Sequence, residues 1–341
     1  MTDRPEVRAH TRATDSQAVE AARQARIGVI IPAYRVAAHI AQVVQEIPPY
    51  VAEIFVIDDA SPDDIAGALR DVRDPRVTLV KHEQNQGVGG AVMTGYERAA
   101  GAGCTILVKV DGDGQMDTGR MLDLIEPLMD GRADYAKGNR FLHSAELRAM
   151  PFFRRVGNIG LTFLAKAASG YWTMFDPANG YTALHVDVWR KLNPRRIAKR
   201  YFFESSLLIE LGCRRAVVED VAIPARYQGE ISSLSPMKVV LEFPPRLFMG
   251  LLRRLGTCYF LYDFTPVSLF LTWGILLTTF AVVWGGIFWR RSIETGIANP
   301  TGTVMIAVVS LVLGVQLLLQ AIALDIQNVP RDPIQQPRRG R

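Results

Sequence analysis

Cysteine and histidine are scarce in this sequence of 341 residues. Its three cysteines are widely spaced, and none stands in a Cys-x-x-Cys pair. Zinc sites and disulfide frameworks need clustered or paired cysteines, so the sequence argues against both and fits a reducing compartment. The five histidines are scattered without metal-ligand spacing, which is typical of exposed or hydrogen-bonded imidazoles.

The amino terminus lacks the apolar core that a signal peptide needs. Residues 1–26 are polar and of mixed charge, so we expect no cleaved leader and a flexible arm over residues 1–25, with a partly helical stretch around Ser16–Arg26. The sequence also lacks a large excess of positive or negative charge, since its net charge is only +5 at neutral pH. Part of that excess lies beside apolar segments, so it gives no case for nucleic acid as a partner.

Apolar residues make up 49% of the chain, and two long runs account for the excess. Val267–Trp289 and Thr301–Leu324 contain no charged residue over 23 and 24 positions. Each exceeds the roughly 20 residues that cross a hydrocarbon core. The alternative is a pair of buried core helices, but two such runs in tandem are unusual in soluble folds. We expect a multi-pass protein of the cell (inner) membrane with a soluble front part.

Arginines flank the two runs unevenly. Arg246, Arg253 and Arg254 precede the first run and four arginines follow the second, whereas the connecting loop carries Arg290 and Arg291. Positive charge close to a span favours the cytoplasmic side, so we place the large amino-terminal part and the tail in the cytoplasm. The expected organisation is a catalytic domain at 26–235, a juxtamembrane segment at 236–264, two spans at 265–326 and a basic tail at 327–341.

The juxtamembrane segment has an amphipathic pattern. Leu247, Leu251 and Leu255 share one helical face, and Arg246, Arg253 and Arg254 gather on another. This pattern suits a helix lying in the headgroup layer, and the alternative is an ordinary packing helix. In the second run Gln316 and Gln320 stand one turn apart, which favours a helix–helix contact and a possible homo-oligomer.

The front part alternates short apolar runs with helical segments. The runs are Ile27–Ile31, Ile54–Ile57, Val77–Val80 and Thr105–Val110. Strands that are nearly all apolar and alternate with helices predict an α/β fold with a mainly parallel sheet covered on both faces. In such sheets ligands bind beyond the carboxyl ends of the strands.

Three motifs fall at that predicted edge: Pro32-Ala33-Tyr34, Asp58-Asp59 and Asp111-Gly112-Asp113-Gly114-Gln115. Residues i and i+2 of an extended chain point to one side, so Asp111 and Asp113 can meet a single hard cation such as Mg²⁺ or Mn²⁺. The alternative is an acidic turn after a strand. Gly87–Gly90 lacks the Gly-x-Gly-x-x-Gly spacing after the first strand, which argues against a Rossmann oxidoreductase.

With these motifs in this order, and Asn85-Gln86-Gly87 between them, the chain resembles family 2 glycosyltransferases. Within that family it is most similar to the polyprenyl-phosphate sugar transferases, the group of dolichyl-phosphate mannose synthase and bacterial undecaprenyl-phosphate glycosyltransferases. The resemblance covers about residues 26–235 and extends to the two-span carboxyl terminus. It implies the GT-A nucleotide-diphospho-sugar transferase fold, followed by an interfacial helix and two transmembrane helices.

The resemblance also implies roles for individual residues. Donor-binding residues would be Pro32, Tyr34, Asp58, Asp59, Asp111 and Gly112, and metal ligands would be Asp111, Asp113 and Gln115. Catalytic residues would be Asp176 and Arg140, and the acceptor phosphate or lipid would be met by Arg140, Arg155, Ser232 and Arg246. Alternative interpretations are a turn or helix cap for Asp176, a surface salt bridge for Arg140 and a helix-terminal charge for Glu204.

Two departures from the family pattern stand out. Arg35-Val36 replaces the Asn-Glu pair that often follows the first strand, and residues 227–233 match the family's Arg-x-x-Gly-Ser-Lys pattern only loosely. A phosphate-binding role for that loop is therefore open.

The resulting hypothesis is an inverting, metal-dependent transferase that moves a sugar from a nucleotide-diphosphate sugar to a polyprenyl phosphate at the membrane. One alternative is a processive polysaccharide synthase, but its Gln-x-x-Arg-Trp segment and additional spans are lacking. The other is a catalytically inactive, membrane-anchored scaffold subunit, against which the Asp111/Asp113 pair argues. The sequence does not specify the sugar or the nucleotide base.

Overall fold

The computed structural model describes residues 12–139, 152–174, 179–223 and 236–335. The chain divides into two compact units. The first unit extends to Leu251 and includes the residues from Pro330 onward, and the second is Leu252–Val329.

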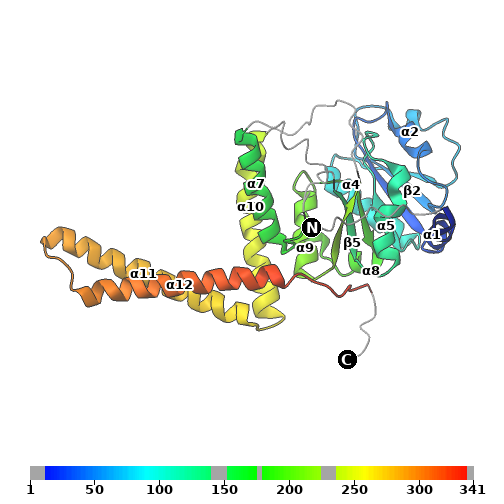
Figure 1. Ribbon diagram of the computed structural model, residues 1–341. Helices are drawn as coiled ribbons and strands as arrows, with labels where there is room; N and C mark the ends of the chain where they lie inside the picture. The colour runs from blue at the N-terminus through cyan, green and yellow to red at the C-terminus, as the bar shows by residue number, and fades with distance from the viewer. Residues whose placement is uncertain (1–11, 140–151, 175–178, 224–235, 336–341) are drawn as a thin grey trace. The chain divides into compact units, whose positions relative to one another are not determined.

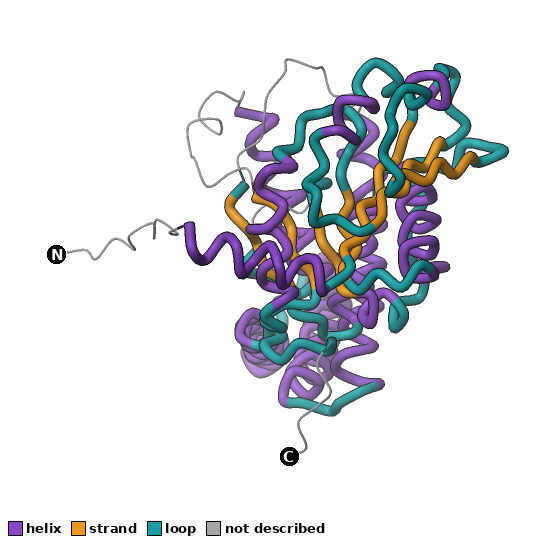
Figure 2. The backbone as a smooth tube through the Cα atoms, turned by 90° about the vertical axis from the view of Figure 1, so that its right-hand side faces the viewer, coloured by secondary structure: helices purple, strands orange, loops and turns teal. Residues whose placement is uncertain are grey.

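The first unit is built on one seven-stranded sheet. Its strands are β1 (Ile27–Ala33), β2 (Glu53–Asp58), β3 (Val77–Lys81), β4 (Ile106–Lys109), β5 (Tyr135–Asn139), β6 (Thr182–His185) and β7 (Val218–Ala222). The order is β3-β2-β1-β4-β6-β5-β7, and β6 runs antiparallel to both of its neighbours. The predicted mainly parallel sheet is therefore confirmed, and Figure 2 shows the strands gathered together with helices around them.

The helices are α1 (Arg12–Gln24), α2 (Ile40–Gln45), α3 (Ile65–Ala68), α4 (Val88–Gly101), α5 (Met121–Met129), α7 (Phe152–Ser169), α8 (Val186–Trp189), α9 (Phe203–Cys213), α10 (Pro236–Gly256), α11 (Pro266–Thr295) and α12 (Thr301–Gln327). Two 3₁₀ turns, η1 (Thr118–Arg120) and η2 (Pro194–Arg196), and a π-helical turn, η3 (Thr257–Leu261), complete the described elements (Figure 1).

Side chains alternate between the two faces of each strand. On one face, Ile106 and Val108 of β4 join a hydrophobic core that includes α1, α2 and α5. The helical stretch expected around Ser16–Arg26 overlaps α1, whose Ala22 is buried in this core rather than lying on a free arm. On the other face lie Leu107 and Lys109, together with α4 and α9. The alternation therefore places the amine of Lys109 on the face opposite the main core.

Helix α10 corrects the expected orientation of the juxtamembrane leucines. Leu247 is 1% exposed and belongs to a core cluster with Phe202 and Ile209, and Leu251 packs against the same cluster. The exposed apolar side chains of this segment include Phe248 and Met249. The leucine face thus packs on protein rather than lying in the headgroup layer, because helix α9 covers it.

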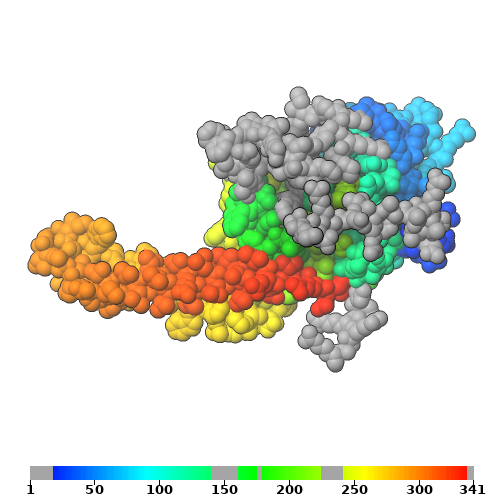
Figure 3. All heavy atoms as spheres, in the orientation of Figure 1, coloured from blue at the N-terminus to red at the C-terminus, as the bar shows by residue number. Residues whose placement is uncertain are grey.

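The second unit contains two helices that are long and apolar enough to cross a membrane, α11 and α12. They approach closely at glycines: a Cβ atom on Gly274 would lie 2.9 Å from Leu318 Cδ2, and one on Gly314 would lie 2.7 Å from Thr278 N. Many of their apolar side chains are exposed, and Figure 3 shows α12 at the surface over its length. Gln316 and Gln320 are exposed as well, so a homo-oligomer through them stays a prediction.

A buried ion pair joins α10 to the end of α12. Arg254 places its two terminal nitrogens 2.8 and 2.9 Å from the carboxylate oxygens of Asp325, and the Tyr259 hydroxyl donates to Asp325 Oδ1 at 2.5 Å. Arg254 is 4% exposed. The expectation that Arg254 belongs to a headgroup-facing arginine group is therefore wrong, because its guanidinium is buried and paired with Asp325 inside the unit.

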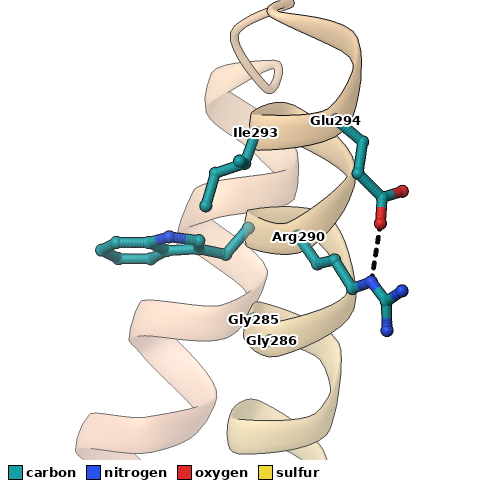
Figure 4. Close-up of a pocket in the computed structure, with 6 residues that line it drawn as sticks. Gly285, Gly286, Arg290, Ile293 and Glu294 are labelled. Atoms are coloured by element: carbon teal, nitrogen blue, oxygen red, sulfur yellow. Dashed lines mark hydrogen bonds and ion pairs between the residues drawn. The ribbon is translucent and has the colours of Figure 1, made fainter.

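At the other end of α11 the surface is hollowed where two glycines, Gly285 and Gly286, lack side chains. Arg290 and Glu294 point toward each other there with a nitrogen–oxygen distance of 2.7 Å, and Ile293 extends from another side of the helix (Figure 4). Both partners of this pair are exposed. A hollow with no buried polar group has no chemistry that would mark it as a catalytic site.

Candidate active site

The Asp111–Gln115 segment follows β4 directly and passes beside the end of β1. A Cβ atom on Gly112 would lie 3.4 Å from the carbonyl oxygen of Pro32 and 3.0 Å from Val36 Cγ2. Glycine at this position therefore allows the loop to approach β1 closely. The structure thus places two of the predicted donor residues, Pro32 and Gly112, side by side at the expected edge of the sheet.

The two carboxylates of this segment have different partners. Asp111 Oδ1 lies 2.7 Å from Lys109 Nζ, and the Asp111 amide donates to Met116 Sδ at 3.2 Å. Asp113 Oδ1 accepts the Gln115 amide at 3.1 Å, in a turn that Gly114 closes with a φ of +77°. Gln115 therefore supports Asp113 through its backbone, and metal ligation by its side chain stays a prediction.

A buried lysine lies beneath Asp111. Lys109 is 1% exposed, and besides Asp111 its amine contacts the Gly180 carbonyl oxygen at 3.2 Å and Glu204 Oε1 at 3.4 Å. Glu204 stands in the first turn of α9. This single amine therefore connects the loop after β4, the segment before β6 and the start of α9.

The charges around this amine change the pKa values of the group. Burial alone would lower the pKa of Lys109, but the nearby carboxylates of Asp111 and Glu204 outweigh it and raise the pKa above its usual value. Burial raises the pKa of Glu204, and the Lys109 charge opposes this only in part. The lysine is therefore a fixed cation, because desolvation is more than offset by two adjacent anions.

Asp58 and Asp59 at the end of β2 have distinct environments, although both are buried. Asp59 accepts the amides of Gln86 and Gly87 at 2.8 and 2.7 Å, one on each oxygen, and its Oδ1 lies 2.8 Å from His82 Nδ1. It thereby fixes the turn that opens α4. Donor binding by Asp59 stays a prediction, and this structural role is an addition to it.

Asp58 has fewer contacts of its own. Its Oδ1 accepts the Ser61 amide at 2.8 Å, and its Oδ2 lies 3.9 Å from Lys81 Nζ. Nearby, Tyr34 exposes 44% of its surface, and the Arg35 guanidinium lies 5.4 Å from the centre of its ring. Asp58 Oδ2 has only a distant cation as its partner among the described residues, and the Tyr34 ring is exposed. A carboxylate oxygen and an aromatic ring of this kind suit recognition of a polar, planar group such as a nucleotide base.

The segment before β6 also reaches this edge. A Cβ atom on Gly180 would lie 2.6 Å from both Asp111 Oδ2 and Lys109 Nζ, and one on Gly138 would lie 3.1 Å from Asn179 Nδ2. The Asn139 side-chain nitrogen Nδ2 donates to Asp220 Oδ2 at 3.2 Å. The end of β5, just before Arg140, thus meets the segment that begins just after Asp176, and Gly180 in that segment lies beside Asp111.

Several predicted site residues cannot be placed. Arg140, Asp176, Ser232 and the loop 227–233 lie outside the described residues. Arg155 is on helix α7, and its side chain is outside the described part as well. Their roles stay predictions.

Arg246 is placed in a basic cavity of about 450 Å³ within the first unit. The lining residues are Asn85, Gln86, Ala198, Lys199, Arg200, Phe202 and Arg246. The Lys199 amine donates to Gln86 Oε1 at 3.0 Å, and the Arg246 guanidinium lies 5.9 Å from the centre of the Phe202 ring. Three cationic side chains around one hollow suit an anionic group.

The residues at the carboxylate pair fit a divalent cation that is shared with a substrate. Among the described residues, no group of three His, Cys, Asp or Glu side chains could hold a metal by itself. Carboxylate oxygens on a partly exposed loop do suit Mg²⁺ or Mn²⁺, which usually keep waters and share phosphate oxygens. Asp111 and Asp113 are the residues that would hold it.

The sequence interpretation did not single out Lys109. For Glu204 it favoured a helix-terminal charge over a loose match to the family pattern, and the structure adds a contact between Glu204 and Lys109. His82 is hydrogen-bonded to Asp59 and Thr94, as expected of a satisfied imidazole. The available signal was a lysine inside an otherwise apolar strand, because a buried cation needs an anionic partner. The identity of that partner was not readable from the sequence.

The glycosyl transferase family 2 sequence model matches residues 28–192. A UDP-N-acetylglucosamine–dolichyl-phosphate N-acetylglucosaminyltransferase of Methanococcus voltae is 30% identical over 241 residues, which cover 66% of this chain and 94% of that protein. The chain belongs to glycosyltransferase family 2. It is also similar to a polyprenol monophosphomannose synthase of Mycolicibacterium smegmatis, with 31% identity over 52% of this chain and 69% of the relative.

Solved structures show the fold of this glycosyltransferase to be GT-A. Glucosyl-3-phosphoglycerate synthase from Mycobacterium tuberculosis, in complex with Mn²⁺, UDP-glucose and phosphoglyceric acid, has a TM-score of 0.53 and 19% identity, covering 74% of this chain and 86% of that one. The same enzyme with Mg²⁺ and UDP has a TM-score of 0.52 and 21% identity, covering 73% and 85%. The predicted enzyme class and fold are confirmed.

Proposed function

We propose that this glycosyltransferase moves a sugar from a nucleotide-diphosphate sugar to a polyprenyl phosphate at the cytoplasmic face of the inner membrane. The observation that carries the proposal is the Asp111/Asp113 pair at the sheet edge of a chain that also has two helices of membrane length. The relatives from Methanococcus voltae and Mycolicibacterium smegmatis, whose names specify dolichyl-phosphate and polyprenol monophosphomannose, support it.

The donor would lie across the carboxyl ends of β1, β2 and β4. Asp58 and Tyr34 would recognise the nucleoside, and Pro32 and Gly112 would form the floor beneath it, because their backbones are already in close approach. Asp111 and Asp113 would hold Mg²⁺ or Mn²⁺ on the diphosphate. When bound, this ion would neutralise the charge that grows on the departing diphosphate.

The acceptor needs little activation. A phosphate monoester has its second pKa near 6 and is mostly dianionic at neutral pH, so a dedicated general base is not required. The protein must instead position two anionic reactants and offset their repulsion. Arg140, Arg155 and Ser232 would bind the acceptor phosphate, and Asp176 would orient the sugar at the reacting centre. Direct attack on the sugar carbon from the side opposite the diphosphate would invert its configuration.

The basic cavity around Arg246 would receive the acceptor on its way to that centre. Lys199, Arg200 and Arg246 line it, and the exposed Phe248 and Met249 follow Arg246 on the same helix. A charged hollow beside exposed apolar side chains matches a phosphate carried on a hydrocarbon tail. This arrangement supports a lipid acceptor over a freely soluble one.

The cytoplasmic orientation follows from the arginine flanks. Arg246, Arg253 and Arg331 lie on the outer flanks, and Arg290 and Arg291 lie near the end of α11 that leads into the short connection to α12. Arg254 is buried with Asp325, so it contributes less to the balance than its sequence position suggested. The remaining excess on the outer flanks still favours placing them on the cytoplasmic side.

The proposal is tested with the full-length protein in membranes. Undecaprenyl phosphate is supplied with a panel of radiolabelled nucleotide sugars, in Mn²⁺, in Mg²⁺ or in EDTA, and label in the lipid fraction is measured. One donor should label the lipid in the presence of metal, adding a single sugar of inverted configuration, and undecaprenol without phosphate should stay unlabelled. A folded protein that labels no lipid with any donor would refute the transferase, and a polymeric product would favour the processive alternative.

A further inference from the structure

The contacts of the Lys109 amine indicate a role in addition to stabilising the fold. Its amine is buried in β4, yet it is 2.7 Å from Asp111 Oδ1, a carboxylate whose side chain is 32% exposed. The amine also retains contacts with Glu204 Oε1 at 3.4 Å and the Gly180 carbonyl oxygen at 3.2 Å. Asp111 is therefore the more exposed carboxylate partner, whereas the Glu204 side chain is 17% exposed.

We propose that Lys109 is a positioning residue that occupies Asp111 as a counter-cation before the donor arrives. A divalent ion alone then binds weakly at Asp111 and binds well only together with the donor diphosphate. The proposal rests on the assignment of Asp111 as a metal ligand in the proposed function. It assigns to Lys109 the coupling of metal binding to donor binding.

The physical argument is competition between two cations for one carboxylate. A divalent ion that reached Asp111 Oδ1 would lie within a few ångströms of the Lys109 amine, and like charges at such distances in a water-poor site repel strongly. The donor diphosphate brings negative charge that offsets both cations. Without that diphosphate, the lysine and the metal oppose each other.

The surroundings determine which group can move. Lys109 is fixed in a central strand, with α4 and α9 over it, whereas Asp111 lies on a partly exposed loop. When Asp111 turns toward a metal, the amine keeps Glu204 and the Gly180 carbonyl as partners. Gly180 permits this packing, because a Cβ atom there would lie 2.6 Å from the amine and from Asp111 Oδ2.

A purely structural lysine would have a different effect. Lys137 on β5 is a buried lysine of this kind. It lies 3.6 Å from Asp220 Oδ1 and does not contact the Asp111 loop in any ion pair of the described residues. If Lys109 only stabilised the fold, its replacement would lower the melting temperature without strengthening metal binding. If Lys109 competes with the metal for Asp111, its replacement should instead strengthen metal binding.

The test measures Mn²⁺ affinity by electron paramagnetic resonance on the full-length protein in detergent, without nucleotide. Lys109→Met should bind Mn²⁺ at least tenfold more tightly than the wild type, and Glu204→Gln should bind it more weakly, because the amine is then left to Asp111 and Gly180. Adding Asp111→Asn to the Lys109→Met variant should remove the gained binding. With a nucleoside diphosphate present, the wild type should gain more Mn²⁺ affinity than Lys109→Met.

The double variant Lys109→Met, Glu204→Gln separates direct contact from net charge. It keeps the formal charge of the Lys109–Asp111–Glu204 group at −1. It also avoids leaving Glu204 without its cation, so it serves as the folded variant if Lys109→Met alone is unstable. Direct competition predicts Mn²⁺ affinity near that of Lys109→Met, and affinity equal to the wild type would overturn it. Unchanged or weaker binding in Lys109→Met would also overturn it. Neither result would touch the transferase proposal, which the lipid-labelling assay decides by itself.

Discussion

Arg254 and Asp325 are 71 residues apart in the sequence and form a two-pronged ion pair with distances of 2.8 and 2.9 Å. Both side chains are almost fully buried, at 5% and 7% exposure. Tyr259 adds a hydrogen bond to the same carboxylate. The pair therefore fastens the end of α10 to the last turn of α12 within the second unit.

Replacing one partner of this pair should destabilise the protein strongly. Arg254→Met leaves the Asp325 carboxylate buried without its cation, which costs about 3–5 kcal/mol for comparable buried pairs. The measurement is thermal unfolding of the detergent-solubilised protein. The double variant Arg254→Met, Asp325→Leu should recover most of the loss, since two apolar groups leave no buried charge. A single variant as stable as the wild type would contradict the buried pair.

Replacing Asp59 should lower the free energy of unfolding more than replacing Asp58. Asp59→Asn loses charge-assisted hydrogen bonds to the Gln86 and Gly87 amides, and should cost about 1.5–3 kcal/mol of unfolding free energy. Asp58→Asn is the matched control, because its Oδ1 can still accept the Ser61 amide. Denaturant unfolding of the two variants provides the comparison. Equal losses would show that the turn opening α4 does not depend on Asp59.

Asp111→Asn and Asp113→Asn should each reduce sugar transfer by roughly 10³-fold. A metal contributes several kcal/mol of charge stabilisation, and each ~1.4 kcal/mol corresponds to a factor of ten. Lipid labelling at saturating donor measures the rate, and circular dichroism should show an unchanged fold. Full activity in either folded variant would remove that residue from the metal site.

His185 gives a prediction for pH. Its Nδ1 accepts the Asp187 amide at 3.3 Å at the start of α8, which requires the neutral ring, and burial lowers its pKa below the usual 6.5. A lowered histidine pKa contributes stability that is complete above the unfolded value and is lost as pH falls through the folded value. Unfolding free energy should therefore fall below about pH 6.5 in the wild type.

His185→Asn is the matched variant for that measurement, because the asparagine oxygen can accept the same amide but does not titrate. Its unfolding free energy should depend less steeply on pH between 7 and 5 than that of the wild type. Identical pH profiles would assign the acid sensitivity to other groups.

The local pattern of the sequence was sufficient for the fold class and for the edge where the site lies. The four apolar runs of the front part became β1 to β4. Strands β1, β2 and β4 are almost fully buried, as nearly continuous apolar runs predict, whereas β3 lies at the edge of the sheet and is partly exposed. The two uncharged runs became α11 and α12, since length and composition alone meet the requirement for crossing a membrane. The Asp111–Gln115 segment followed its strand as predicted.

Only the tertiary structure decided which side chains meet. Lys109 and Glu204 are 95 residues apart, and Arg254 and Asp325 are 71 apart, so no local periodicity encodes either pair. The sequence shows that α10 is amphipathic, but it does not show what covers the apolar face that carries Leu247. In the structure α9 covers that face, so it packs on protein. Hydrophobic pattern and turn chemistry act over neighbouring residues, whereas partners of a buried charge are chosen when distant segments pack together.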